Sequence, residues 1–156
     1  MPERPTWRDD TPQPVQDDLD ALAQAAFEEA GSLLGRHRDF PPFAVVVHAD
    51  GRHGLVASDP GPGPEPESQV LLERLVASVR GASEDYRAVG FVALVLTRAG
   101  DAVRVELEHR DGGPALLLLR PCRVNRLRRR VAMGAVAGSF GNRLVWPVEA
   151  DQGPAS

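Results

Sequence analysis

The chain has 156 residues, of which 42% are hydrophobic and 26% are charged, and its formal net charge at pH 7 is −4. These values are typical of a globular domain, so they exclude a chain that is disordered throughout, and the length fits one domain with a single core. No run approaches the roughly 18 consecutive apolar residues that a membrane-spanning helix needs, which excludes a transmembrane helix.

All 18 basic residues are arginine, and the chain contains neither lysine nor isoleucine. We attribute this bias to the codon usage of a GC-rich genome, so an arginine here is a weaker functional signal than in a balanced sequence. The single cysteine, Cys122, cannot form an internal disulfide, and no charged and then apolar leader pattern opens the chain. We therefore expect a cytoplasmic protein.

The first predicted element is a helix that follows a polar segment. Residues 1–16 contain four prolines and no periodic pattern, which predicts a disordered tail. From Asp17 to Gly35, apolar residues recur at steps of three and four, which predicts a helix with one buried stripe, capped by Asp17 or Asp18. The residues of this stripe are Leu19, Leu22, Ala23, Ala26, Phe27, Ala30, Leu33 and Leu34.

A β-hairpin is predicted next. Two prolines at positions 41 and 42 exclude a helix, and residues 43–48 have the composition of a strand. The pair Asp50-Gly51 supplies the positive φ angles of a tight turn, so residues 53–58 should return as an antiparallel strand. Four prolines within residues 59–67 then predict a stiff, solvated loop.

A second helix and a three-stranded meander follow. Residues 68–81 carry a broad apolar stripe of helical period. Residues 86–97 are apolar on both faces and should form a central strand, whereas residues 103–109 alternate and should leave one face in solvent. Residues 115–120 complete the meander.

The pattern of residues 121–147 leaves two interpretations open. Residues 126–137 fit a helix or a strand, and each glycine in a helix interior would cost about 1 kcal/mol. Residues 141–147 end in what we interpret as a short edge strand. Residues 17–148 are expected to form a single domain, with residues 149–156 as a second disordered tail.

The predicted fold class is α+β. We expect a single antiparallel sheet of about five to six strands with two main helices. The predicted element order is α-β-β-α-β-β-β, followed by a C-terminal helix or hairpin.

This element order, over about residues 17–120, resembles that of roadblock and profilin-like domains. The stretches FPPFAVVVHADG (residues 40–51) and AVRVELEHRDGG (residues 102–113) are also similar to recurrent stretches of an uncharacterised family of small bacterial proteins without a known activity. The resemblance implies helices packed on the faces of one antiparallel sheet, and the roadblock-like fold further implies a homodimer.

The most unusual stretch is RPCRVNRLRRR, residues 120–130, which holds six arginines. Residues 1–119 carry 11 arginines and 20 acidic residues, a charge of −9, whereas residues 120–156 carry 7 arginines and 2 acidic residues, a charge of +5. The candidate partner-binding or anion-binding residues are Arg120, Arg123, Arg126, Arg128, Arg129 and Arg130.

Three interpretations of this arginine run remain open. It binds nucleic acid or another phosphoanion, it binds an acidic protein partner, or it pairs with acidic residues of the same chain such as Glu106 and Glu108. Nucleic-acid surfaces usually add stacking aromatic residues to the basic patch, and no aromatic residue follows this run until Phe140.

The histidines supply some, but too few, of the ligands that a metal site needs. His48 and His53 flank the predicted hairpin turn, and His109 lies on another strand. A zinc site needs three or four converging ligands, and the sequence brings only two together. We therefore predict no metal and no cofactor, and we interpret these histidines as exposed residues at strand ends.

The sequence offers few candidate catalytic residues. Arg120 and Arg123 would lower the pKa of the Cys122 thiol if they lay beside it, although a half-buried structural cysteine is the simpler interpretation. Glu106 and Glu108 share one strand face, where alternation predicts solvent exposure and a role as surface charge or as partners for Arg104 and Arg110. The sequence contains neither the G-x-S-x-G motif nor a phosphate-binding loop.

The sequence thus favours a non-enzymatic cytoplasmic protein-interaction or regulatory module that binds a protein partner or a second copy of itself. The first alternative is a nucleic-acid or phosphoanion binder that uses residues 120–130. The second alternative is a small enzyme that uses Cys122 or the histidines.

Overall fold

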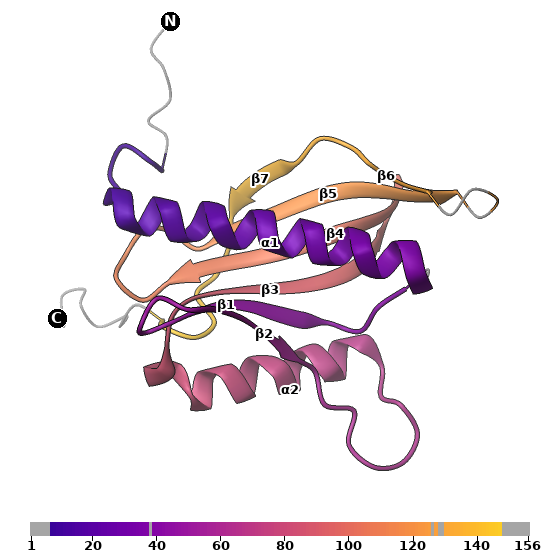
Figure 1. The fold of residues 1–156 in the computed structure, drawn as a ribbon, viewed down its shortest axis with the longest axis horizontal. Helices are drawn as coiled ribbons and strands as arrows, with labels where there is room; N and C mark the ends of the chain where they lie inside the picture. Colours follow the sequence, from indigo (N-terminus) through magenta and orange to yellow (C-terminus); the bar gives the residue numbers. More distant parts are fainter. Residues whose placement is uncertain (1–6, 38, 126, 128–129, 148–156) are drawn as a thin grey trace, which may run out of the picture.

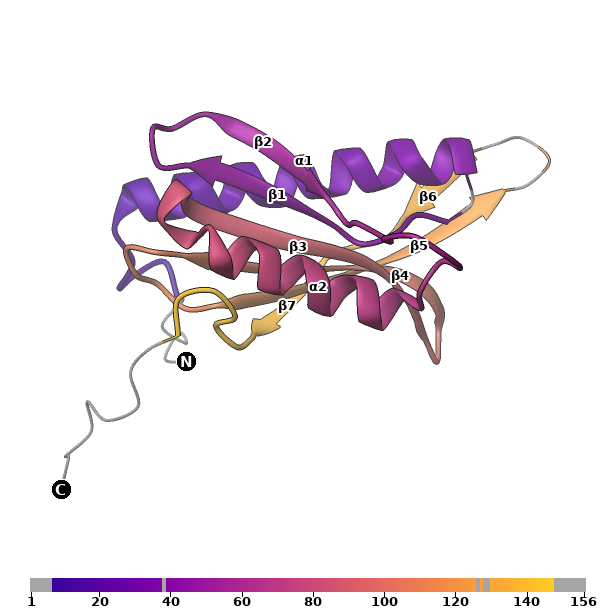
Figure 2. The same cartoon turned by 90° about the horizontal axis from the view of Figure 1, so that it is seen from below.

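The fold consists of two helices on opposite faces of a seven-stranded antiparallel sheet (Figures 1 and 2), as seen in a computed structural model that describes residues 7–37, 39–125, 127 and 130–147. The helices are α1 (Gln13–His37) and α2 (Ser68–Gly81). The strands are β1 (Phe43–His48), β2 (His53–Ala57), β3 (Tyr86–Thr97), β4 (Gly100–His109), β5 (Leu116–Asn125), β6 (Arg130–Met133) and β7 (Ala137–Phe140). The predicted α+β class is confirmed.

The strands are arranged in the order β2-β1-β3-β4-β5, and both β6 and β7 pair with the outer edge of β5. The central position of β3 agrees with its apolar composition, because both of its faces are covered. No helix in the described part of the chain is long and apolar enough to span a membrane.

The sheet separates two hydrophobic clusters because neighbouring residues on a strand point to opposite faces. On the α1 face, Val45 and Val47 pack with Leu19 and Leu22 of the helix. On the α2 face, Val46 of the same strand packs with a smaller cluster that includes α2 and the segment after β7. One continuous apolar strand therefore supports a helix on each side.

The start of the chain differs from the prediction. Helix α1 begins at Gln13 rather than Asp17, and the described part of the predicted tail packs on the helix. The Gln16 amide is buried and donates hydrogen bonds to the carbonyl oxygens of Arg8 and Thr11. These contacts fix residues 7–16, so the disordered tail does not extend to residue 16. Residues 1–6 and the predicted tail at 149–156 lie outside the described residues.

The C-terminal segment forms strands, which settles the alternative left open for residues 121–147. Strand β5 continues to Asn125, and β6 and β7 return along its edge, in place of the helix considered for residues 126–137. Residues 141–147 do not form the predicted edge strand. They cross the α2 face of the sheet, where Val145 is buried in the smaller cluster.

This crossing segment also corrects the prediction that one face of β4 lies in solvent. Glu108 is only 3% exposed, and its carboxylate accepts the backbone N–H groups of Leu144, Val145 and Trp146 at 2.7, 2.9 and 2.9 Å. The Arg143 guanidinium donates to the carbonyl oxygens of residues 109, 113 and 146. Side chains therefore alternate along β4 between two faces that are both covered, and neither face lies in solvent as predicted.

Candidate functional site

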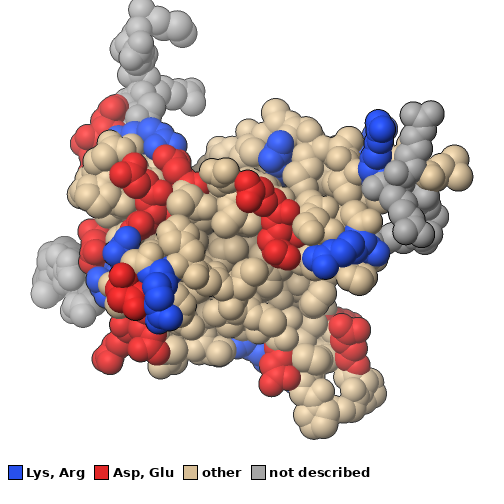
Figure 3. Space-filling model, in the orientation of Figure 1, with Lys and Arg blue, Asp and Glu red and all other residues tan. Residues whose placement is uncertain are grey.

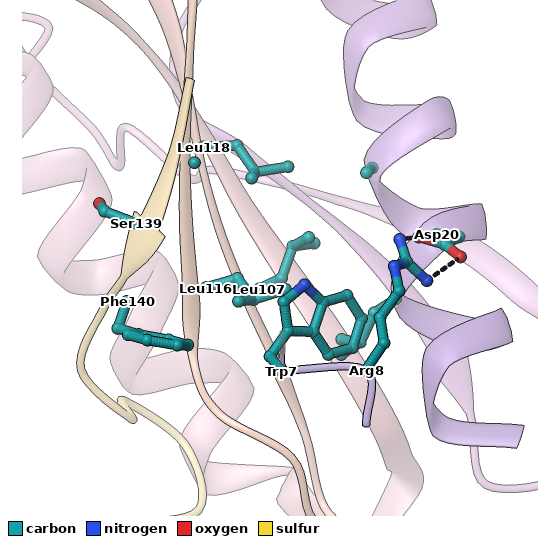
Figure 4. Close-up of a pocket in the computed structure, with 11 residues that line it drawn as sticks. Trp7, Arg8, Asp20, Leu107, Leu116, Leu118, Ser139 and Phe140 are labelled. Carbon is teal, nitrogen blue, oxygen red and sulfur yellow. Dashed lines mark hydrogen bonds and ion pairs between the residues drawn. The ribbon is translucent and has the colours of Figure 1, made fainter. Parts of the chain in front are cut away.

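An apolar groove of about 330 Å³ lies between the first half of α1 and the edge formed by β5 and β7. Its walls include Leu107, Leu116 and Leu118 of the sheet. Figure 4 shows these leucines between Phe140 on the β7 side and an ion pair, Arg8–Asp20, on the α1 side. The groove offers an apolar surface with one neutralised ion pair at its rim.

The segment before α1 closes one end of this groove. The Arg8 guanidinium donates two hydrogen bonds to the Asp20 carboxylate, at 2.7 and 2.9 Å, and lies 4.5 Å from the ring centroid of Trp7. The Thr11 hydroxyl donates to the carbonyl oxygen of Trp7. These contacts hold the indole beside the groove, although the sequence predicted a tail at this position.

The opposite rim is open because β7 extends the sheet beyond the area that α1 covers. Phe140 lies opposite Leu116 in the register, and Gly138 lies opposite Leu118, so both face the α1 side. No side chain of Gly138 fills the space next to Leu118, and the Phe140 side chain is 69% exposed. An aromatic ring at the mouth of an apolar groove is thus accessible.

The arginine run divides among different environments. The Arg120 guanidinium donates to the carbonyl oxygen of Gly134 at 2.9 Å and lies 5.3 Å from the Phe27 ring centroid, which indicates a structural role. Arg123 and Arg130 are exposed and form no ion pair within the part of the chain that the structure describes.

The other three arginines of the run, Arg126, Arg128 and Arg129, lie outside the described residues. Arg123 lies opposite Ala132 and Arg130 lies opposite Asn125, so the two arginines are diagonal neighbours on the sheet face away from α1. Figure 3 shows basic but no acidic side chains beside the β5–β6 hairpin, whereas both kinds crowd the end of the molecule where α1 begins.

The prediction that the arginine run pairs with Glu106 and Glu108 is wrong for the described arginines. Glu106 forms its ion pair with Arg104 at 3.4 Å, and Glu108 binds backbone N–H groups. Both carboxylates are therefore satisfied locally, which leaves the exposed arginines of the hairpin without these partners.

Cys122 is not an activated nucleophile in this fold. Its side chain is buried in the cluster under α1, and this burial raises the pKa of the Cys122 thiol, with a smaller contribution from Asp101. Arg123 follows Cys122 on the strand and points to the opposite face of the sheet. The hypothesis that neighbouring arginines lower this pKa is therefore wrong.

The histidines do not converge. The His48 ring packs 5.4 Å from the Tyr86 ring, and His53 lies across the hairpin opposite Val47. His109 is buried, not exposed, and binds Asp18 on α1. Within the described ranges, no group of three or more His, Cys, Asp or Glu side chains is placed to hold a metal ion.

The contact between His109 and Asp18 was not predicted, because the two residues are 91 positions apart and nothing in the local pattern joins them. The groove was missed for a related reason, since its walls come from the N-terminal segment, α1 and three strands. One sequence signal was available, namely the lack of charge around the exposed Phe140. Comparison with protein-family models, curated proteins and solved structures found no match to this chain.

Proposed function

We propose that this chain is a non-enzymatic, cytoplasmic protein-interaction module that receives apolar side chains of a partner protein in the groove between α1 and β7. The observation that carries this proposal is the accessible Phe140 ring at the mouth of an apolar groove. Exposed apolar surface that is rimmed by polar groups is typical of interaction sites.

The size and chemistry of the groove support a protein partner. Its volume of about 330 Å³ is at the lower end of the range of roughly 300–1,000 Å³ for ligand sites, which suits a few side chains better than a large cofactor. Arg8 and Asp20 neutralise each other, so the rim adds no net charge that would demand a charged ligand. Aromatic residues at the centre of such a patch contribute strongly to binding.

Site-specific crosslinking tests this proposal. A photoreactive phenylalanine analogue replaces Phe140 in one variant and Leu96, which is 82% exposed near the end of β3, in the control. In cytosol of the native organism, we expect discrete protein adducts from position 140 that are absent from position 96. Ala23→Trp fills the groove from α1 and should abolish these adducts while the circular dichroism spectrum stays unchanged. Identical adducts at both positions, or adducts that Ala23→Trp leaves intact, contradict the proposal.

A second candidate function is the binding of nucleic acid or another phosphoanion by the β5–β6 hairpin. Arg123 and Arg130 favour it because they lie on one face without an acidic partner among the described residues. A mobility-shift assay with single-stranded and duplex DNA should show binding at low salt that collapses at moderate salt and weakens in the variant Arg123→Ser/Arg130→Ser. The absence of any shift at low salt would remove this candidate.

A further inference from the structure

We propose that the interaction partner at β7 is a second copy of this chain, which pairs antiparallel with the outer edge of β7 around a two-fold axis at Gly138. This inference rests on the proposed interaction function and adds the identity of the partner and the register of the contact. Four observations support it.

The first observation is the open backbone edge of β7. This strand pairs only with β5 among the described residues, and all four of its residues are exposed. The Gly141 N–H points inward and donates to the Ala115 carbonyl oxygen at 2.8 Å. Because backbone groups alternate along an antiparallel strand, those of Gly138 and Phe140 point away from β5. They offer the hydrogen bonds that a further strand needs.

The second observation is that this edge lacks the usual protection against pairing. Edge strands are normally blocked by charged side chains, proline or a covering element. Residues 131–142 contain no charged residue and no proline. At the opposite edge of the sheet, β2 begins beside the exposed residues Arg52 and His53. Of the two sheet edges, the edge of β7 is therefore better suited than that of β2 to pair with a strand of another chain.

The third observation is that the edge is complementary to itself. A two-fold axis perpendicular to the sheet keeps the α1 faces of both copies on the same side. With Gly138 opposite its own copy, Phe140 of one chain lies opposite Val136 of the other. Phe140 is 69% exposed and Val136 is 45% exposed. The dimer would contain two such contacts, one on each side of the two-fold axis, and each contact would cover both side chains. Such reciprocal contacts define an isologous interface.

The fourth observation concerns charge. A two-fold contact places a surface patch against the same patch of the other copy, so a charged patch would repel its copy whereas an uncharged patch does not. Arg123 on β5 and Arg130 on β6 lie in the β5–β6 hairpin, and β7 lies toward the other end of this edge (Figure 1). Since paired antiparallel strands run in opposite directions, the two hairpins would point away from each other. The uncharged β7 edge is thus compatible with the cationic hairpin of the same chain.

The test is the oligomeric state of the full chain, measured by sedimentation over a range of micromolar concentrations. We expect the wild-type chain to dimerise and Phe140→Lys or Val136→Glu to raise the dimer dissociation constant at least about tenfold. Leu55→Lys places the same charge on the β2 edge and should leave the dimer unchanged. The double variant Val136→Glu/Phe140→Lys should recover the dimer, because the carboxylate introduced at position 136 would face the ammonium group introduced at position 140 of the other copy.

Two results would overturn the inference: a wild-type chain that stays monomeric at high micromolar concentration, or a dimer that Leu55→Lys dissociates and Phe140→Lys does not. Failure to recover the dimer in the double variant would overturn the proposed register. Crosslinking at position 140 separates this inference from the proposed function. If the chain is monomeric but position 140 still captures another protein, the proposed function stands and the second-copy partner does not.

Discussion

His109 on β4 and Asp18 on α1 form a hydrogen bond of 2.8 Å that joins the helix to the sheet. The Nδ1 atom of His109 accepts the backbone N–H of Asp111 at 3.0 Å, so the ring proton resides on Nε2, which donates to the Asp18 carboxylate. Arg87 on β3 donates two further hydrogen bonds to the same carboxylate, at 3.0 and 3.1 Å. One carboxylate thereby binds two neighbouring strands.

The first prediction concerns the pH dependence of stability through Asp18. Burial raises the pKa of Asp18, but hydrogen bonds from Arg87 and His109 outweigh it, so the pKa lies below its usual value. A carboxyl with a lowered folded-state pKa contributes stability above its unfolded-state pKa, and that contribution disappears as the pH falls through the folded-state value. The free energy of unfolding of the wild-type chain should therefore decrease as the pH is lowered below about 4. Asp18→Asn should cost about 1–3 kcal/mol at pH 7 and remove this part of the acid dependence.

Urea unfolding at pH 7, 4 and 3 measures this effect. Asp17→Asn is the matched control, because Asp17 is exposed and, among the residues that the structure describes, bonds only the Gln13 amide on its own helix. An equal loss of stability in the two variants at pH 7 would show that the Asp18 contacts contribute nothing specific.

The second prediction concerns Glu108 and the segment that crosses the α2 face. Glu108→Ala leaves three backbone N–H groups of residues 144–146 without their acceptor. Hydrogen bonds to a charged group contribute about 1.5–3 kcal/mol each, so the variant should lose at least about 2 kcal/mol of stability. Hydrogen exchange at residues 144–146 should accelerate before global unfolding. Glu106→Ala, which breaks the ion pair with Arg104, should cost less than about 1 kcal/mol.

The third prediction concerns the reactivity of Cys122. Because burial raises the pKa of this thiol and covers it, a disulfide reagent should modify it slowly at pH 8 in the native chain. In urea the thiol regains its usual pKa and exposure, and the reaction should become at least about tenfold faster. The colour released by the reagent measures both rates. Equal rates in the two conditions would mean that β5 does not bury this residue.

The fourth prediction concerns Gly90, at the centre of β3. A Cβ atom at this position would lie 2.7 Å from Leu107 Cδ2 and 3.0 Å from Val45 Cγ2, closer than side chains approach each other. Gly90→Ala should therefore destabilise the fold by about 1–3 kcal/mol through overpacking. Gly81→Ala has no neighbouring atom within 4 Å of the new Cβ and serves as the control in thermal unfolding. A thermal midpoint unchanged by Gly90→Ala would contradict the close packing of β3 between its neighbours.

Local pattern in the sequence was sufficient for most elements. The helical period at residues 68–81 and the apolar runs at 43–48 and 86–97 correspond to α2, β1 and β3. These predictions succeed because hydrophobic period and turn residues act within a few positions of the chain. The start of α1 was predicted too late because its first turn is fixed by contacts of Gln16 with residues 8 and 11, which periodicity does not report.

The sequence by itself determined the α+β class, the two helices and the uneven distribution of charge, since composition and periodicity are properties of the chain. Only the tertiary structure decided that Glu108 is buried, that Asp18 binds His109, and that Trp7 and Phe140 border one groove. The physical reason is that these relationships join residues far apart in the chain, and their hydrogen bonds and desolvation arise only after the sheet has formed.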